Sequence, residues 1–144
     1  MDLPESIKRK LVPAEEAVSI IAPGESIFVG TACATPRILI EAMEKSTKNL
    51  SDLQIFHFLT DGAIAMKDGK PITRFKHRTF FVGNDMREAI KRGQSDYIPI
   101  SIAQAPSLIE NGRMPVDTAL VQVSFPEAEG YVSLGISVDI AKCA

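Results

Sequence analysis

Tryptophan is absent from the 144 residues of this chain, and aromatic residues make up only 6% of them. Single-stranded nucleic acids are bound on aromatic platforms and along clustered lysines and arginines. The chain has neither feature, since its 16 basic and 18 acidic residues give a formal net charge of −2. We therefore expect no nucleic-acid partner.

Cysteine is almost as scarce, because Cys33 and Cys143 are the only two and lie far apart. Zinc sites and disulfide frameworks need clustered or regularly spaced cysteines and histidines. We therefore expect no bound metal and a reducing compartment. Without an activating base nearby in the sequence, Cys33 is interpreted as a packing residue rather than a reactive one.

Long hydrophobic runs are missing as well. No stretch approaches the roughly 20 apolar residues that cross a bilayer, and the N-terminus lacks the basic and apolar regions of a secretory signal. We expect a cytoplasmic protein without membrane contacts. Hydrophobic residues still make up 45% of the chain, and its 144 residues suffice for one domain with a substantial core.

Short apolar runs between turn residues predict buried strands, and amphipathic runs between them predict helices. The predicted strands are residues 26–29, 53–59, 78–82, 97–100 and 117–123, and the predicted helices are residues 14–21, a segment opened by Pro36, residues 84–92 with Asn84 as the N-cap, and residues 105–111. This alternation predicts an α/β domain, in which a mostly parallel sheet is flanked by helices in three layers.

In parallel sheets ligands bind beyond the carboxyl ends of the strands. Residues at or after these ends are the candidate binding residues: Gly30, Thr31, Thr60, Gly62, Ser124, Gly130, Ser133 and Gly135. Thr31 and Thr60 could bind a substrate carboxylate or polarise an acyl oxygen. An equally good alternative is that both hydroxyls cap the following turn. For Gly130 and Gly135 the alternative is a tight turn that needs positive φ.

Several segments, taken in order, resemble the N-terminal domain of the acetyl-CoA hydrolase/transferase family, which includes acetate and 4-hydroxybutyrate CoA-transferases. The segments are residues 16–24, 27–31 with Pro36, 80–84 with Arg87, 93–99, 116–124 and, most specifically, 130–139. Three positions depart from the family's pattern: Ala32 replaces a glycine, Thr35 replaces a carboxylate, and Phe125 stands where proline is usual.

The resemblance implies a fold like that of NagB, RpiA and the CoA-transferases. It also implies that CoA moves between an acyl-CoA, such as acetyl-CoA, and a small carboxylic acid through a glutamyl-CoA thioester. The nucleophilic glutamate belongs to a second domain, and no segment here matches its motif. Residues 1–144 are accordingly expected to be an incomplete N-terminal domain without a catalytic residue, with CoA as a substrate rather than a tightly bound cofactor.

Such a domain needs a partner, either the second domain or a separate subunit, and an uncovered sheet edge or apolar patch would favour a homo-oligomer. The alternative is a non-catalytic module that binds a small carboxylate or a nucleotide, or a subunit that completes its site with a partner chain. The sequence leaves both hypotheses open.

Other polar residues are interpreted structurally. Glu127 and Glu129 follow Pro126 in a turn and are expected in solvent rather than in a carboxylate pair. His57 lies between two phenylalanines, which favours a buried histidine bonded to the backbone over a catalytic base. A cluster of basic residues is interpreted as part of a solvated hairpin loop rather than as a site for the phosphates of CoA. Its members are Lys67, Lys70, Arg74, Lys76, His77 and Arg78.

Overall fold

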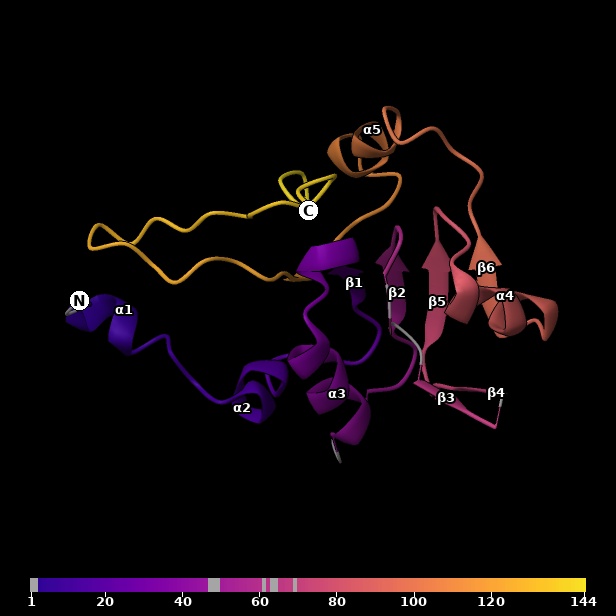
Figure 1. Cartoon of the computed structure of the whole chain (residues 1–144), viewed down its shortest axis with the longest axis horizontal. Coiled ribbons are helices and arrows are strands. Elements are labelled where there is room, and N and C mark those ends of the chain that lie inside the picture. The colour runs from indigo at the N-terminus through magenta and orange to yellow at the C-terminus, as the bar shows by residue number, and fades with distance from the viewer. Residues whose placement is uncertain (1–2, 47–49, 61, 63–64, 69) are drawn as a thin grey trace.

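The computed structural model describes residues 3–46, 50–60, 62, 65–68 and 70–144. Its centre is a five-stranded sheet in the order β6-β5-β2-β1-β7, in which every neighbouring pair is parallel (Figure 1). The strands are β1 (Ser26–Val29), β2 (Gln54–His57), β5 (Lys76–Thr79), β6 (Ser95–Tyr97) and β7 (Thr118–Leu120). A small antiparallel hairpin, β3 (Ala65–Lys67) and β4 (Lys70–Ile72), lies beside this sheet.

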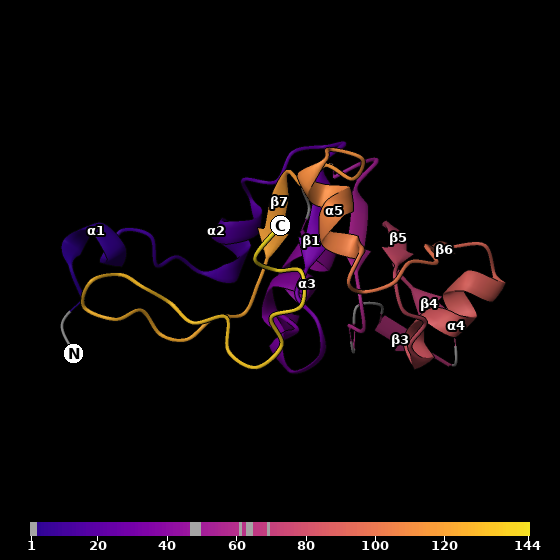
Figure 2. The same cartoon turned by 90° about the horizontal axis from the view of Figure 1, so that it is seen from above.

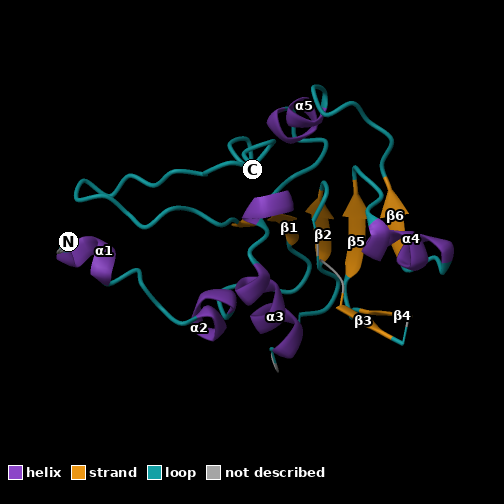
Figure 3. Ribbon diagram, in the orientation of Figure 1, coloured by secondary structure: helices purple, strands orange, loops and turns teal. Residues whose placement is uncertain are grey.

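Helices cover both faces of the sheet, which confirms the predicted three layers (Figure 3). They are α1 (Glu5–Lys8), α2 (Ala14–Val18), α3 (Arg37–Lys45), α4 (Asn84–Lys91) and α5 (Ala105–Glu110), with a 3-10 turn, η1 (Ala32–Ala34), between β1 and α3. The alternation of side chains along β1 divides the core. Ile27 and Val29 pack with α2 and α3, whereas Phe28 packs with α5.

Burial on both faces explains why β1 is apolar at three successive positions, Ile27, Phe28 and Val29, none of which is more than 1% exposed. β1 also has a parallel neighbour on each side, β2 and β7. Its end therefore lies at the middle of the sheet edge, with the ends of β2 and β7 beside it. This arrangement gathers the segments on which the candidate residues lie.

Several predicted boundaries are wrong. The strand predicted at residues 78–82 is β5, which begins at Lys76 and ends at Thr79; its polar residues belong to the sheet because they pair with β2 and β6. The predicted edge strand at residues 97–100 is β6, displaced towards the N-terminus, and β7 is shorter than residues 117–123. Helix α2 ends at Val18 rather than residue 21. Gly83, and not Asn84, is the N-cap of α4, without a side-chain capping bond.

After β7 the chain leaves the sheet as a long irregular hairpin, residues 121–139, here called the C-terminal arm. Both views show it extending away from the sheet to α1 (Figures 1 and 2). The Ser124 amide donates to the Ser133 carbonyl and the Glu127 amide to the Tyr131 carbonyl, both at 2.9 Å. Most side chains of the arm are exposed, and Tyr131 is 74% exposed. Among the described residues, no helix is long and apolar enough to cross a membrane.

Candidate functional site

The chain turns sharply where β1 ends, and Gly30 makes this turn possible. Its amide donates to the Leu120 carbonyl of β7 at 2.8 Å. A Cβ atom on Gly30 would lie 2.9 Å from the Ala34 carbonyl oxygen and 3.4 Å from that of Leu120. Any side chain here would therefore push η1 away from the sheet. The backbone at this edge can approach its surroundings closely because the residue is glycine.

Thr31 is buried, and its hydroxyl donates a hydrogen bond to the carboxylate of Asp139 at the far end of the arm. The other oxygen of that carboxylate accepts a hydrogen bond from the Ile140 amide. Thr31 precedes η1 without a side-chain capping bond, so the capping alternative is wrong for this residue. Its hydroxyl instead fastens the end of the arm to the end of β1.

The Thr60 hydroxyl likewise connects the segment after β2 to the end of β1. This buried hydroxyl lies 3.4 Å from the Gly30 carbonyl oxygen, to which it donates, and the Ala32 amide donates to the Leu59 carbonyl at 2.7 Å. Thr31 and Thr60 thus belong to one connected edge. Gly62 follows in an exposed turn with φ of 78°.

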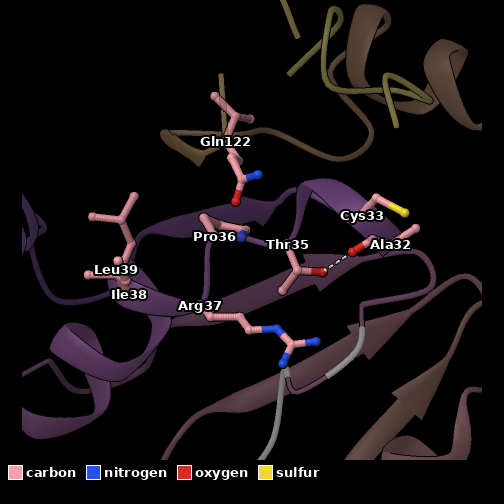
Figure 4. A pocket seen from close by; sticks show the side chains of 9 residues that line it. Ala32, Cys33, Thr35, Pro36, Arg37, Ile38, Leu39 and Gln122 are labelled. Atoms are coloured by element: carbon pink, nitrogen blue, oxygen red, sulfur yellow. Dashed lines mark hydrogen bonds between the residues drawn. The ribbon is translucent and has the colours of Figure 1, made fainter. Parts of the chain in front are cut away.

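A cavity of about 510 Å³ opens beside this edge (Figure 4). It is mostly apolar, with one guanidinium and one amide, and is lined by Ala32, Cys33, Thr35, Pro36, Arg37, Ile38, Leu39, Val121 and Gln122. The positions of Ala32 and Thr35, which depart from the family's pattern, both line it. The Thr35 hydroxyl donates to the Ala32 carbonyl at 2.8 Å, so its proton is held within the turn.

A second cavity of about 240 Å³ shares Cys33 and Gln122 with the first and continues along the base of the arm. It brings together the candidate residues Ser124, Ser133 and Gly135. The Ser133 amide donates to the Ser124 hydroxyl at 2.9 Å, and the Gly135 amide to the Ser133 hydroxyl at 3.1 Å. These small polar residues shape the wall by bonding to each other.

Two predictions about this region need correction. Cys33 is exposed and lines both cavities, so it is not a packing residue. Gly130 lies at the tip of the arm, where a Cβ atom would be 2.9 Å from the Ile7 side chain of α1. It does not join the other candidates. Glu127 and Glu129 are exposed in the turn, as predicted.

Sequence reasoning missed Gln122, Arg37 and Asp139 as parts of the region. Each has a weak signal in hindsight: Gln122 follows a strand end, Arg37 opens α3, and Asp139 ends the most family-like segment. Their approach depends on the turn at Gly30 and on the return of the arm. Periodicity carries no information about such long-range contacts.

His57 is fully buried and faces away from Phe56 and Phe58, as predicted, but neither ring nitrogen has a hydrogen-bond partner. Its ring packs edge-on against His77, with ring centroids 5.5 Å apart. Burial lowers the pKa of His57 to about 4 and that of His77 to about 3, so both are neutral at pH 7.

Among the basic residues around the hairpin, Arg74, Lys76, His77 and Arg78 do not form one patch, and the side chain of Lys67 lies outside the described part of the chain. Lys76 and Arg78 both pair with Asp96, at 3.3 and 3.7 Å. Arg74 donates to the carbonyls of Met43 and Ser46 at the end of α3, and His77 is buried. Within the described part of the chain, no group of three potential metal ligands comes together.

Known proteins match this architecture and sequence. The chain is 38% identical over 144 residues to a 4-hydroxybutyrate coenzyme A transferase of Clostridium kluyveri, covering all of this chain and 34% of that protein. It is 33% identical to a succinyl-CoA:acetate/propanoyl-CoA:succinate CoA transferase of Fasciola hepatica, covering 90% of this chain and 27% of that protein. RipA from Yersinia pestis superposes with a TM-score of 0.76 at 30% identity, covering 94% of this chain and 34% of RipA.

The chain therefore spans about a third of the length of the curated relatives that it matches. Residues 1–144 match the family described as the acetyl-CoA hydrolase/transferase N-terminal domain. With the parallel sheet and the shared fold of RipA, this match over the whole chain shows that the protein belongs to the acetyl-CoA hydrolase/transferase family.

Proposed function

We propose that this chain is the N-terminal part of a CoA-transferase or acyl-CoA hydrolase that moves CoA between an acyl-CoA, such as acetyl-CoA, and a small carboxylic acid. The observation that carries the proposal is the family match over all 144 residues. Both relatives named above are CoA transferases, and their names include small carboxylates or their CoA esters.

The proposed reaction runs through a glutamyl-CoA thioester, and its glutamate lies outside residues 1–144. A carboxylate suits this chemistry because it attacks the thioester carbonyl and expels the CoA thiolate, which then attacks the resulting anhydride. The acyl group leaves as a carboxylate, and no net proton is needed. This chain contributes a wall of the site rather than the nucleophile.

Within that wall, we assign the binding of the reacting acyl or carboxylate group to the edge formed by Gly30, Thr31, Thr60 and Gly62. The hydroxyls of Thr31 and Thr60 already donate to Asp139 and to the Gly30 carbonyl. Their role is therefore to hold the edge in position rather than to donate to the substrate. Ser124, Ser133 and Gly135 form the adjoining wall.

The alternative is a non-catalytic binding module, or a subunit that completes its site with a partner chain. The connected edge and the adjoining cavities support that hypothesis equally well, because a binding module also needs a wall of this kind. A cytoplasmic location and assembly into a homo-oligomer complete the proposal. The exposed apolar side chains of the C-terminal arm support assembly, since large apolar patches favour contacts between proteins.

The test is isotope exchange between labelled acetate and acetyl-CoA. The chain alone is expected to give none. A chimera, in which this chain replaces the aligned third of the Clostridium kluyveri relative, is expected to restore exchange and to form a CoA thioester that mass spectrometry detects on the downstream glutamate. Exchange by the chain alone would overturn the placement of the glutamate, and a folded chimera without exchange would refute the proposed function.

Thr31→Val in the same chimera tests the assigned edge. The acceptor-acid KM is expected to rise by about tenfold if the hydroxyl network positions the binding edge, in line with the loss of a hydrogen bond to a charged group. Thr118→Val is a matched control, because the Thr118 hydroxyl also donates to a carboxylate, that of Glu25 at 2.8 Å, but Thr118 lies at the start of β7, away from the strand ends. An unchanged KM in Thr31→Val would remove Thr31 from the site.

A further inference from the structure

A third cavity, of about 290 Å³, lies on the face of the sheet that α5 covers. It shares no residue with the two cavities at the strand ends, and the proposed function does not involve it. Its lining combines apolar side chains with two guanidinium groups: Ser26, Gln54, Phe56, Arg78, Ile98, Leu108, Arg113, Met114 and Pro115.

The floor of this cavity follows from the register of the sheet. Gln54 and Phe56 are two residues apart on β2, so their side chains leave the same face. Ser26 pairs with Gln54 across β1 and β2, and Arg78 pairs with Phe56 across β2 and β5. The parallel ladder therefore places a charged arginine in the same row as an aromatic core residue. Met114 and Leu108 form part of the opposite wall.

Arg78 is an unusual residue for this row, since the same face of the sheet otherwise packs phenylalanines against α5. Its side chain is 35% exposed, and its guanidinium carbon lies 5.8 Å from the centre of the Phe56 ring. The only acidic partner among the described residues is Asp96, at 3.7 Å, which also binds Lys76 at 3.3 Å. Because Asp96 is shared with Lys76, it does not occupy all the N–H donors of Arg78.

Arg113 is the second cation of the lining, and its guanidinium has neither a hydrogen bond nor an ion pair within the described part of the chain. No acidic residue lines the cavity. Asp117, which precedes β7, accepts a hydrogen bond from the Ser26 amide at 2.8 Å. Asp96 compensates part of the charge of Arg78, whereas Arg113 has no acidic partner among the described residues. The cavity thus presents an excess of positive charge beside apolar side chains.

We propose that this cavity binds a small carboxylate with a flat apolar body, of the chemical class of benzoate. A guanidinium matches a carboxylate with two parallel N–H···O bonds, and its plane stacks on flat rings. Ile98, Leu108 and Met114 provide the apolar contacts for the body of the ligand. The volume of about 290 Å³ is near the lower end of small-molecule sites, which favours a compact ligand.

The test is NMR of the chain with ¹³C-labelled methionine methyl groups, titrated with benzoate. Met114 lines the cavity, whereas Met43 and Met86 lie in separate parts of the core and serve as internal controls. Benzoate is expected to shift the Met114 signal in a saturable manner and to leave the other two in place. This local signal separates the cavity from any carboxylate binding at the strand ends.

Arg113→Gln is expected to weaken benzoate binding at Met114 by about tenfold, as for the loss of one charge-assisted hydrogen bond. Arg9→Gln, which removes an exposed arginine remote from the lining, is the matched control and should change nothing. Benzyl alcohol, a neutral analogue, should bind much more weakly than benzoate. The proposal is overturned if Met114 does not respond to millimolar benzoate, or if Arg113→Gln and Arg9→Gln bind it equally well.

Discussion

Lowering the pH from 7 to 5 is expected to destabilise this fold, because its only two histidines are both buried without charge. His57 is 0% exposed and His77 is 2% exposed. Three of their four ring nitrogens lack a partner, and the fourth lies 3.0 Å from the Thr73 hydroxyl. An imidazolium at either position would have to be desolvated beside the other ring.

The magnitude follows from the difference in pKa between the folded and unfolded chain. Burial lowers the pKa to about 4 for His57 and about 3 for His77, from an unperturbed 6.5. The stability that these neutral rings confer is complete above pH 6.5 and is lost as the pH falls towards 4. Between pH 7 and pH 5 only the unfolded chain takes up protons, which costs about 2 kcal/mol per histidine and about 4 kcal/mol in total.

Glu44 opposes this trend. Its carboxylate accepts a hydrogen bond from Thr73 at 2.8 Å, and burial raises its pKa above the usual value of 4.5. Glu44 therefore takes up its proton at a higher pH in the folded chain than in the unfolded one, and this favours folding as the pH falls.

The assay is urea unfolding followed by circular dichroism at pH 7, 6 and 5. His57→Leu removes one of the two groups and leaves a side chain of comparable size, so the loss between pH 7 and pH 5 should fall to about half, about 2 kcal/mol. The double variant with His77→Leu should lose almost all of this pH dependence. Equal unfolding free energies of the wild-type chain at pH 7 and pH 5 would refute the reasoning, and so would an unchanged loss in His57→Leu.

Three further predictions concern the strand ends and the arm. Thr31→Val should cost about 2 kcal/mol and speed amide exchange around residue 140, as expected for a bond to a carboxylate, whereas the control Thr118→Val should leave that exchange unchanged. Gly30→Ala should lower the free energy of unfolding by about 1–3 kcal/mol because its Cβ would meet backbone oxygen, and an unchanged free energy of unfolding would contradict that contact. Tyr131→Ser should reduce self-association measured by sedimentation, whereas Ile20→Ser, at an equally exposed site outside the arm, should not.

The sheet was predictable where burial on both faces leaves a continuous apolar run. Residues 26–29 were predicted with the right bounds because β1 has neighbours on both sides. β5 was misplaced by two to three residues, since its sequence Lys76–Thr79 is polar and only the ladders with β2 and β6 make it a strand. The bounds of edge and near-edge strands are harder to predict from their own sequence, because these strands bury less of their surface and therefore have a weaker apolar pattern.

The candidate site was predictable in position but not in contacts. The rule that ligands bind beyond strand ends located Gly30, Thr31 and Thr60, which the structure joins into one edge. It could not identify Asp139 as the partner of Thr31, because the two residues are 108 positions apart and meet only when the arm returns. The same return separates Gly130 from the site, although it is close in sequence to Ser133.

The arm has the residues of a buried segment but lies in solvent. Phe125, Tyr131 and Ile136 are 66%, 74% and 85% exposed. Single exposed apolar residues are common on protein surfaces, but these three occur in one segment. Because the arm has few backbone hydrogen bonds of its own, its direction depends on its two ends: β7 at one, and the Thr31–Asp139 bond at the other. Loss of that bond should release the apolar segment, so the stability of the arm and the geometry of the strand-end edge are coupled through one hydroxyl.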